Sequence, residues 1–506
     1  MTINFIPNDP LVTDPPMRAV AARPDRAATK AGFAVQGNEP QARYAPGTTG
    51  FVRWQARQAA ILAVEAWEKA LGKPFTTWAA EVPDPKRLAL APDAGDDLNA
   101  YYDRTSVSFF HHDIGATVAY SGASTDVVAH EVGHGVLDAL RPDLWDTNYL
   151  EVGGFHEGFG DVTAIITALN DRKTRLAVLA ASPNLGTANV VEATAEDLSN
   201  AIRLVLGPQH PAAKPRRALN TFQWQLPSTM PSNGGPDVMI AEVHSIARII
   251  TGCFWDVLRA IFAANPTKTE ATLWTATKTA AQIFHAGSAN APEVPRFFRA
   301  VGRAMVLADA SQFAGAHRDL IGAAFAGHGL PLGSNAMLAP EFELAGPAPK
   351  AAAAMSLAPA TNKHLRSMLQ VPAGVKLSVA PAGVDASAAS VRYRLPVDLG
   401  DVDPRLRGVT AMADVHTLVG ASGGRAALLG AAPLVEENAQ AVRTFVSSLL
   451  AHGQIALPTP RGARRSERAG IVATKGGEER PTHVVAGSGK SRVVQRVAFR
   501  CRCCGG

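Results

Sequence analysis

Hydrophobic residues recur every three or four positions over most of the segment from residue 52 to residue 330, and this spacing predicts helices. The first covers residues 52–71 and is stopped by Gly72 and Pro74. Further helices are expected at residues 125–140, 154–169, 245–264 and 270–285, with two more between 294 and 325. The central part of the chain is therefore predicted to be mainly helical.

A period of two replaces the helical spacing just before this region. Short β-prone runs at residues 105–110 and 117–120 are separated by His111, Asp113 and Gly115, which predicts a small sheet. Because the sheet precedes the helices instead of alternating with them, the expected fold class is α+β. Residues 1–49 are rich in Pro, Ala and Arg without periodicity, and we expect an extended or poorly ordered lead-in there.

The region after Pro331 has a different composition. Residues 332–360 are rich in Pro and Ala and are predicted to be a linker. Residues 361–506 then form an expected C-terminal accessory region of unknown role, with strands at 390–397 and 492–500 and a helix near 439–450. This region shows no repeat and no catalytic set of residues.

Composition narrows the class of protein. Of 506 residues, 47% are apolar and 18% are charged, a balance typical of a folded globular protein. The net charge is only +5, and the basic cluster at 461–468 is interpreted as a solvated linker, so a nucleic-acid partner is not supported. No apolar run reaches the roughly 18 residues of a membrane-spanning helix. The first residues lack a secretory signal pattern, which favours a cytoplasmic protein and leaves secretion by another route open.

The four cysteines do not form a disulfide framework. Cys253 stands alone in a helical pattern, and the other three are Cys501, Cys503 and Cys504. We interpret that end of the chain as an exposed tail, with binding of a soft metal as the alternative. The Gly-Lys-Ser run before residue 492 is not a phosphate loop, because Val484 occupies the position of its first glycine.

The motif that carries chemistry lies in the helix expected at 125–140, where the sequence reads His130-Glu131-Val132-Gly133-His134. A spacing of four places both imidazoles one turn apart on one face, so both can reach one metal ion. Glu131 lies on the neighbouring flank, where its carboxylate can approach a water molecule at the metal. This HExxH arrangement predicts a zinc site with Glu131 as the general base. A merely structural cluster is disfavoured, because such groups are costly to bury without a cation.

A catalytic zinc usually has three protein ligands and an open position. The next helix offers Glu157 and Asp161, which are four residues apart and share one face. We assign Glu157 to the metal and Asp161 to a hydrogen bond that fixes the tautomer of a ligand histidine. His156 points about 100° away around the helix, so a packing or surface role is preferred. A third histidine ligand fails because Leu137 and Leu140 stand where that motif needs Gly and His.

Four segments together resemble the thermolysin-like zinc metallopeptidases, or gluzincins, in order and approximate spacing: Asn99-Ala100-Tyr101-Tyr102, Ser121-Gly122, the HEVGH helix and Glu157-x-x-x-Asp161. The interval from His134 to Glu157 is slightly longer than usual in that family, which implies a small insertion. The similarity covers about residues 50–331. It implies a two-lobed peptidase, with sheet and active-site helices in residues 50–170 and a helical lobe in residues 171–331.

The resemblance also implies a histidine that stabilises the tetrahedral intermediate. Asn233-Gly234-Gly235 followed by Glu242-Val243-His244-Ser245 is similar to the segment that bears it, so His244 takes this role. The family usually places an aspartate a few residues earlier. Met239 stands at that spacing, which leaves Asp237 or Glu242 as the partner of His244.

Substrate contacts follow from the same resemblance. Either Arg216 or Arg217 corresponds to the arginine that contacts the substrate carbonyl and the third ligand. Asn99 and Ala100 match the family's edge segment, which pairs with an extended peptide. Tyr149 is similar to the tyrosine that assists the oxyanion, with its register off by about one residue.

The expected function is that of a zinc endopeptidase, which cleaves a peptide or protein substrate with a metal-activated water and Glu131 as base. One alternative is a zinc aminopeptidase or other zinc hydrolase, although no Gly-x-Met-Glu-Asn-like segment is present. The other is a non-catalytic peptide-binding relative, against which the retention of Glu131 and His244 argues. Asp126 resembles a calcium-site aspartate of the family, but acidic partners are not evident after Asp161. Helix capping is therefore the preferred interpretation of Asp126, with calcium as the alternative.

Overall fold

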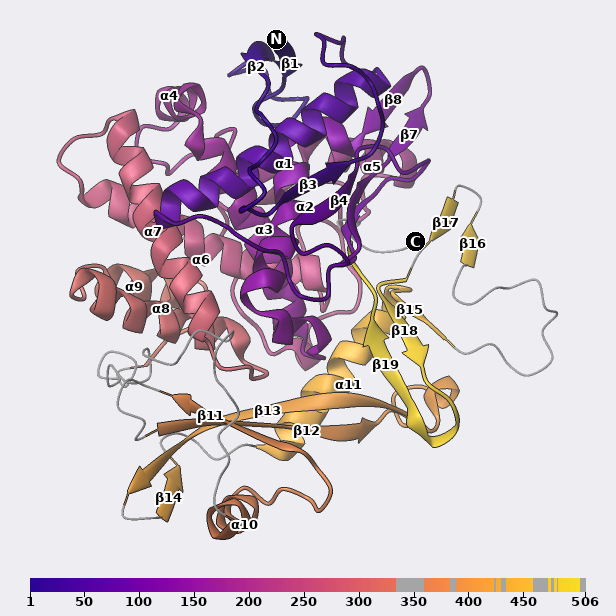
Figure 1. Cartoon of the computed structure of the whole chain (residues 1–506), viewed down its shortest axis with the longest axis vertical. Helices are drawn as coiled ribbons and strands as arrows, with labels where there is room; N and C mark the ends of the chain where they lie inside the picture. Colours follow the sequence, from indigo (N-terminus) through magenta and orange to yellow (C-terminus); the bar gives the residue numbers. More distant parts are fainter. Residues whose placement is uncertain are drawn as a thin grey trace.

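Helices and several sheets build the described chain in the computed structural model (Figure 1). The structure describes residues 1–333, 359–382, 388–422, 425–428, 434–457, 472–474, 477–479 and 481–500. The basic cluster at 461–468, the three cysteines after residue 500 and most of the expected linker lie outside these ranges. The mixture of helical and sheet regions agrees with the expected α+β class. Within the described ranges, no helix combines the length and apolar character needed to cross a bilayer.

A five-stranded sheet supports the N-terminal part of the molecule. Its strands follow the order β20-β5-β6-β4-β3, with β3, β4 and β6 mutually parallel and β5 antiparallel to both of its neighbours. The bounds are β3 Gly32–Val35, β4 Arg87–Ala91, β5 Ala100–Tyr102, β6 Ser106–Phe109 and β20 Phe499–Arg500. A hairpin of β7 (His111–Ile114) and β8 (Thr117–Tyr120) follows β6 in the chain. Both predicted runs are therefore strands, but they belong to two different sheets instead of one small sheet.

Helices α2 (Thr125–Leu140) and α3 (Leu150–Asn170) form the centre of the molecule, and almost every residue of both is buried. They approach closely because glycines face each other between them. A Cβ at Gly133 would lie 2.9 Å from the Cα of Gly160, and a Cβ at Gly160 would lie 2.6 Å from Nδ1 of His130. A side chain at either position would push the helices apart. These glycines thus determine how closely the two halves of the HExxH…E motif approach each other.

The remaining helices of this body surround α2 and α3. Their bounds are α1 Thr49–Leu71, α4 Arg172–Ala181, α5 Glu196–Leu206, α6 Val243–Ala264, α7 Glu270–Asn290, α8 Phe297–Phe313 and α9 Arg318–Gly327. A two-residue pairing of β9 (Ala193–Thr194) with β10 (Arg216–Arg217) lies between α4 and α6 in the chain. Helix α6 begins with Glu242 as N-cap, whose carboxylate accepts hydrogen bonds from the amides of His244 and Ser245. Helical periodicity predicted the main helices to within a few residues at each end.

The N-terminal 49 residues were expected to be extended or poorly ordered, and they form an ordered segment of short extended strands. Strand β1 (Thr2–Phe5) pairs with β2 (Arg18–Ala21), and β3 is an edge strand of the five-stranded sheet. Ile3 and Phe5 are buried, and the Asp9 side chain is fully buried as well. Each strand has only four residues, too few for a periodic signal, and its partners lie far along the chain. The Pro- and Ala-rich composition therefore hid an ordered segment.

The C-terminal region contains a second, seven-stranded sheet in the order β11-β12-β13-β19-β18-β15, with β14 paired to β13. Its strands are β11 Leu377–Ala382, β12 Ala388–Asp398, β13 Val409–Ser422, β14 Arg425–Leu428, β15 Ile455–Ala456, β18 His483–Ala486 and β19 Arg492–Arg496. The region also contains α10 (Pro359–Met368), α11 (Val435–Ala451) and a hairpin of β16 (Val472–Thr474) with β17 (Gly477–Glu479). The predicted strand near 390 and helix near 439 are both found.

The strand predicted at 492–500 is divided between the two sheets. Strand β19 belongs to the C-terminal sheet, whereas β20 pairs with β5 in the N-terminal sheet. Figure 1 shows the yellow end of the chain rising from β19 to the purple N-terminal part. Phe499 also belongs to the same buried core cluster as the helices of the body. The C-terminal region is thus joined to the body and contributes a strand to it, which an accessory region behind a linker did not predict.

Candidate metal centre

Three side chains from α2 and α3 converge at one point. One potential ligand atom from each of His130, His134 and Glu157 lies within 4.8 Å of the others. The Nε2 atom of His130 is 3.2 Å from the carboxylate of Glu157, and Nε2 of His134 is 3.8 Å from it. The two imidazole rings stand perpendicular, with centroids 4.9 Å apart. All three residues assigned to the metal by sequence are therefore placed together, in the buried interface between the two helices.

Behind this group, a carboxylate orients one of the histidines. Asp161 lies one turn after Glu157 on α3 and accepts a hydrogen bond of 2.9 Å from Nδ1 of His130. Arg216 on β10 donates to the same carboxylate, with its Nη2 2.7 Å from Oδ1 of Asp161. The Nδ1–H tautomer of His130 leaves Nε2 free to bind a cation. Asp161 thus occupies the position predicted for it, and Arg216 is the arginine of the pair that reaches the site.

Glu131 is buried beside the three ligand candidates. Both of its carboxylate oxygens lack a hydrogen-bond partner among the described residues, and so do both ring nitrogens of His134. Unpartnered polar atoms are rare in protein interiors, since leaving one costs about 1–3 kcal/mol. A cation at Nε2 of His134 and a water molecule at Glu131 would satisfy this nitrogen and the carboxylate, and would leave Nδ1 of His134 without a partner among the described residues. The donor set of two imidazoles and a carboxylate also fits zinc.

The protonation states of His134 and Glu157 suit a cation site, whereas burial of His130 is outweighed by its hydrogen bonds with Asp161 and Glu157, which raise its pKa to about 9, so a cation would have to replace a proton there. Burial lowers the pKa of His134 to about 3, so its imidazole is neutral at pH 7. Burial opposes ionisation of Glu157, but the facing His244 and His134 hold its pKa well below the usual range. Burial, together with the charge of Glu157, raises the pKa of Glu131 to about 8. A neutral imidazole and an ionised carboxylate are the forms that bind zinc, and Glu131 has a pKa close to that useful for a base near neutral pH.

His244 at the start of α6 faces the same centre. Its Nε2 lies 3.1 Å from the carboxylate of Glu157, and its Nδ1 lies 2.8 Å from Oε1 of Glu242. The choice left open between two partners is resolved by these contacts, because Asp237 forms an exposed ion pair with Lys214 instead. Glu242 serves both as the N-cap of α6 and as the group that orients His244. Glu242, the capping residue two positions before the histidine, thus takes the place of the aspartate that was expected further upstream.

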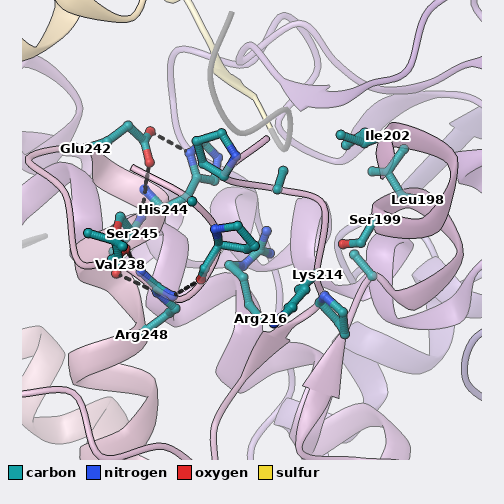
Figure 2. A pocket seen from close by; sticks show the side chains of 16 residues that line it. Leu198, Ser199, Ile202, Lys214, Arg216, Val238, Glu242, His244, Ser245 and Arg248 are labelled. Atoms are coloured by element: carbon teal, nitrogen blue, oxygen red, sulfur yellow. Dashed lines mark hydrogen bonds and ion pairs between the residues drawn. The ribbon is translucent and has the colours of Figure 1, made fainter. Parts of the chain in front are cut away.

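A pocket adjoins His244 and Arg216 (Figure 2). Its cavity volume is about 40 Å³, and it is partly open to solvent. Leu198 and Ile202 of α5 line one side of it, across from His244. Lys214 contributes a positive charge at its lower edge. We refer to His130, His134 and Glu157 together as the metal group. The pocket could accept a side chain of a molecule bound there.

Two predicted site residues are placed elsewhere. The guanidinium of Arg217 pairs with Glu192, and its side chain is 48% exposed. The hydroxyl of Tyr149 donates to the main-chain carbonyl of Asp414 on β13, and the ring is buried. The predicted oxyanion role of Tyr149 is therefore corrected: its proton is committed to the C-terminal sheet. The uncertain register of Tyr149 in the sequence already indicated a weak match.

The predicted peptide-pairing edge is already paired. Asn99 is buried and bonds to its neighbours, through Asp97 and the amide of Ala100. The outer edge of β5, to which Ala100 belongs, carries β20 as an added antiparallel strand. The ring of Phe499 on β20 stacks on His134, with centroids 4.9 Å apart and planes at 14°. It also stacks on His156 at 3.9 Å, which gives that histidine the packing role expected of it.

A second group of carboxylates lies at the start of α2. Potential ligand atoms of Asp9, Asp126 and Glu196 lie within 4.8 Å of one another. Oδ2 of Asp126 accepts a hydrogen bond from the amide of Ala195, and Asp9 accepts one from the amide of Asp197. Asp126 therefore also joins the start of α2 to the segment just before α5 through the amide of Ala195. Asp9 and Glu196 were missed because nothing in their local sequence links them to α2; their contacts are made over long chain distances.

Comparison of the chain with models of known protein families, and with curated proteins, gives no match. The geometry and chemistry of the site must therefore carry the functional argument.

Proposed function

We propose that this chain is a zinc-dependent endopeptidase with the two-lobed architecture of the thermolysin-like family. The observation that carries the proposal is the convergence of His130, His134 and Glu157 beside a buried carboxylate, Glu131, that has no hydrogen-bond partner among the described residues. The sequence sets the two histidines and Glu131 on one helix, and the glycine contact with α3 brings Glu157 to them. When bound there, zinc would supply Lewis-acid polarisation of a substrate carbonyl and would lower the pKa of a water molecule.

The chain's own residues have distinct tasks in this proposal. Glu131 takes a proton from the attacking water and delivers it to the leaving amine, and its raised pKa allows both transfers. His244 donates from Nε2 to the carbonyl oxygen as negative charge develops there. Glu242 holds the proton on Nδ1 of His244 and so fixes that donor in place. Asp161 and Arg216 hold His130 in the orientation that leaves its Nε2 facing the centre.

A peptide would bind along the sheet edge. The outer edge of β5 carries β20 in the structure, and once β20 is displaced an extended chain can pair with this edge through main-chain hydrogen bonds. The pocket next to His244 would receive a side chain of that peptide. This arrangement supports an endopeptidase, because a strand paired along an edge can continue past the site in both directions. Peptides with blocked amino termini should therefore be cleaved as well as unblocked ones.

The test combines metal analysis with cleavage of unfolded casein. Because Phe499 covers His134, the assay uses Phe499→Ala in parallel with the unchanged chain. We expect zinc near one ion per chain and cleavage that a zinc chelator abolishes. Glu131→Gln in the same background should keep the zinc and lower cleavage by a factor of about 10²–10⁴. The control is Glu436→Gln, the same chemical change on an exposed side chain of α11, which should alter neither.

Two results would contradict the proposal. Casein cleavage that survives Glu131→Gln undiminished would remove the base from the mechanism. A zinc-loaded Phe499→Ala chain that cleaves no unfolded protein would favour the non-catalytic, peptide-binding alternative.

A further inference from the structure

The end of the described chain lies where the proposed function expects a substrate. Strand β20 pairs with the outer edge of β5, with Phe499 opposite Tyr102 and Arg500 opposite Tyr101. This is strand addition by an extended peptide, but the peptide belongs to the same chain. The ring of Phe499 on this strand covers His134, which is completely buried in a site that should admit a substrate.

Side chains of the segment are anchored at the metal group. The ring of Phe499 stacks on His134 and His156 and meets Trp145 edge-on, with centroids 5.3 Å apart. The guanidinium of Arg496 lies over the ring of Phe499, 4.0 Å from its centroid. The Nε of Arg496 donates to the carbonyl of Trp145. Only 2% of the Phe499 side chain is exposed. Burial of this aromatic ring therefore holds the segment in place.

One carbonyl of the segment meets a group of the proposed machinery. The Nε2 atom of His244 lies 2.6 Å from the main-chain oxygen of Arg500. The same nitrogen is 3.1 Å from the carboxylate of Glu157, so the Arg500 carbonyl lies next to the metal group. In the proposed mechanism His244 donates to the carbonyl that is attacked. The carbonyl that it contacts in the structure is the one that joins Arg500 to Cys501.

We propose that the chain is its own first substrate and cleaves the peptide bond between Arg500 and Cys501 in cis. This inference rests on the proposed function and names a substrate for it. Water adds across the amide: its oxygen bonds to the carbonyl carbon of Arg500, and the carbon–nitrogen bond breaks. One proton of the water passes through Glu131 to the nitrogen of Cys501. The products are a carboxylate on Arg500 and a free amine on the segment that begins with Cys501.

Retention of β20 after cleavage has a consequence for other substrates. The new carboxylate would remain attached to β19, and Phe499 would still cover His134. Cleavage of other proteins then requires displacement of β20 from the edge of β5. Replacement of Phe499 by Ala should therefore slow cleavage in cis and accelerate cleavage of casein, each by about tenfold, since the lost anchor is worth more than one factor of ten in binding.

The experiment follows the mass of the 506-residue chain after zinc is added to metal-free protein. We expect loss of the segment that begins with Cys501, at a rate independent of protein concentration. Glu131→Gln should remain intact, also when it is mixed with the unchanged chain, because cleavage occurs within one molecule. Val497→Ala is the matched control in the same segment: its side chain is 38% exposed, and cleavage should proceed as in the unchanged chain.

A second readout does not depend on activity. Hydrogen exchange of the amides at 498–500 is measured in metal-free Glu131→Gln, and those amides should be protected there. They should exchange at least about ten times faster in the double variant with Phe499→Ala. Free exchange in the first variant would show that β20 does not dock and would overturn the inference.

The results separate this inference from the proposed function. If zinc-loaded Phe499→Ala digests casein while the unchanged chain keeps the bond after Arg500, the peptidase stands and self-cleavage is wrong. If neither chain cleaves any peptide bond with zinc in place, both proposals fail. Cleavage that depends on protein concentration, or that also removes the segment from admixed Glu131→Gln, would contradict the cis reaction.

Discussion

Two groups of carboxylates lie along helix α2 in opposite electrostatic settings. Beside the middle of the helix, Glu157 of α3 faces three imidazoles, which hold its pKa well below the usual range in spite of burial. At the start of the helix, Asp126 faces Asp9 and Glu196, and burial together with the charges of Asp126 and Asp9 raises the pKa of Glu196 to about 9. The first group faces imidazoles that can carry positive charge, whereas the second accepts hydrogen bonds from neutral amides and keeps its like charges together. Burial alone does not set the charge of a carboxylate; its neighbours decide it.

The largest effect, on both zinc affinity and stability, is expected from Glu157→Gln, which removes the negative charge that faces the histidines. Zinc affinity should fall by about 100-fold or more, because one of three ligands is lost. The metal-free protein should also lose about 3 kcal/mol of unfolding free energy, since the facing histidines lose their buried partner. Isothermal titration and urea unfolding measure the two quantities.

The matched control for this change is Glu151→Gln on the same helix. Glu151 is also buried, but its oxygens accept hydrogen bonds from the indole of Trp224 and the amide of Phe298 instead of facing the metal group. Zinc affinity should stay within about threefold of the unchanged chain, because no ligand is altered. Equal losses of zinc affinity in both variants would mean that Glu157 acts only through folding.

Glu196→Gln is expected to raise the unfolding free energy, in contrast to Glu157→Gln. A carboxyl whose pKa is higher in the folded chain binds its proton more tightly there, so its stabilising contribution is complete below the ordinary pKa near 4.5 and is lost as pH rises towards about 9. Without added cations, this substitution should therefore raise the unfolding free energy by about 1 kcal/mol at pH 8 and change it little at pH 4. Urea unfolding at both values checks it; a loss of stability at pH 8 would be the contrary result.

A smaller effect, on the melting temperature, tests whether the carboxylates of Asp9, Asp126 and Glu196 bind a cation. Asp126 was interpreted from sequence as a helix cap, with calcium as the alternative, and its convergence with Asp9 and Glu196 favours the latter. Millimolar calcium should raise the melting temperature of the unchanged chain by a few degrees, through preferential binding to the folded state. The increase should be reduced in Glu196→Gln. An identical shift in both would leave Asp126 as a capping residue.

The smallest effect on cleavage is expected from a substitution of Tyr149. Its hydroxyl donates to the carbonyl of Asp414, so Tyr149→Phe should cost about 1 kcal/mol of stability through a lost buried hydrogen bond. Casein cleavage in the Phe499→Ala background should stay within about threefold. A loss of a hundredfold or more would restore the oxyanion role that the sequence suggested.

Local pattern was enough to predict the core of the site. The period of α2 fixes both its bounds and the common face of His130 and His134, and a spacing of four on α3 does the same for Glu157 and Asp161. Each of these relations lies within one helix. The close contact between the helices could then be expected from the chemistry of the ligands, because a metal site requires it.

Contacts between distant segments could not be predicted in this way. Asp9 lies in a short segment without periodicity, and Glu196 begins a helix that the pattern did not single out. The run at 492–500 showed β propensity throughout, but no local signal indicates that the chain leaves one sheet after Arg496 and enters another at Phe499. Propensity describes what a segment can form, whereas the partner that it pairs with is decided by packing elsewhere.

The central claim is that zinc binds between α2 and α3, and anomalous diffraction at the zinc edge tests it most directly. Crystals of the zinc-loaded Glu131→Gln chain should show one strong peak about 2.0–2.2 Å from Nε2 of His130, Nε2 of His134 and a carboxylate oxygen of Glu157. A map with no peak there, or with the zinc only among Asp9, Asp126 and Glu196, would contradict the account.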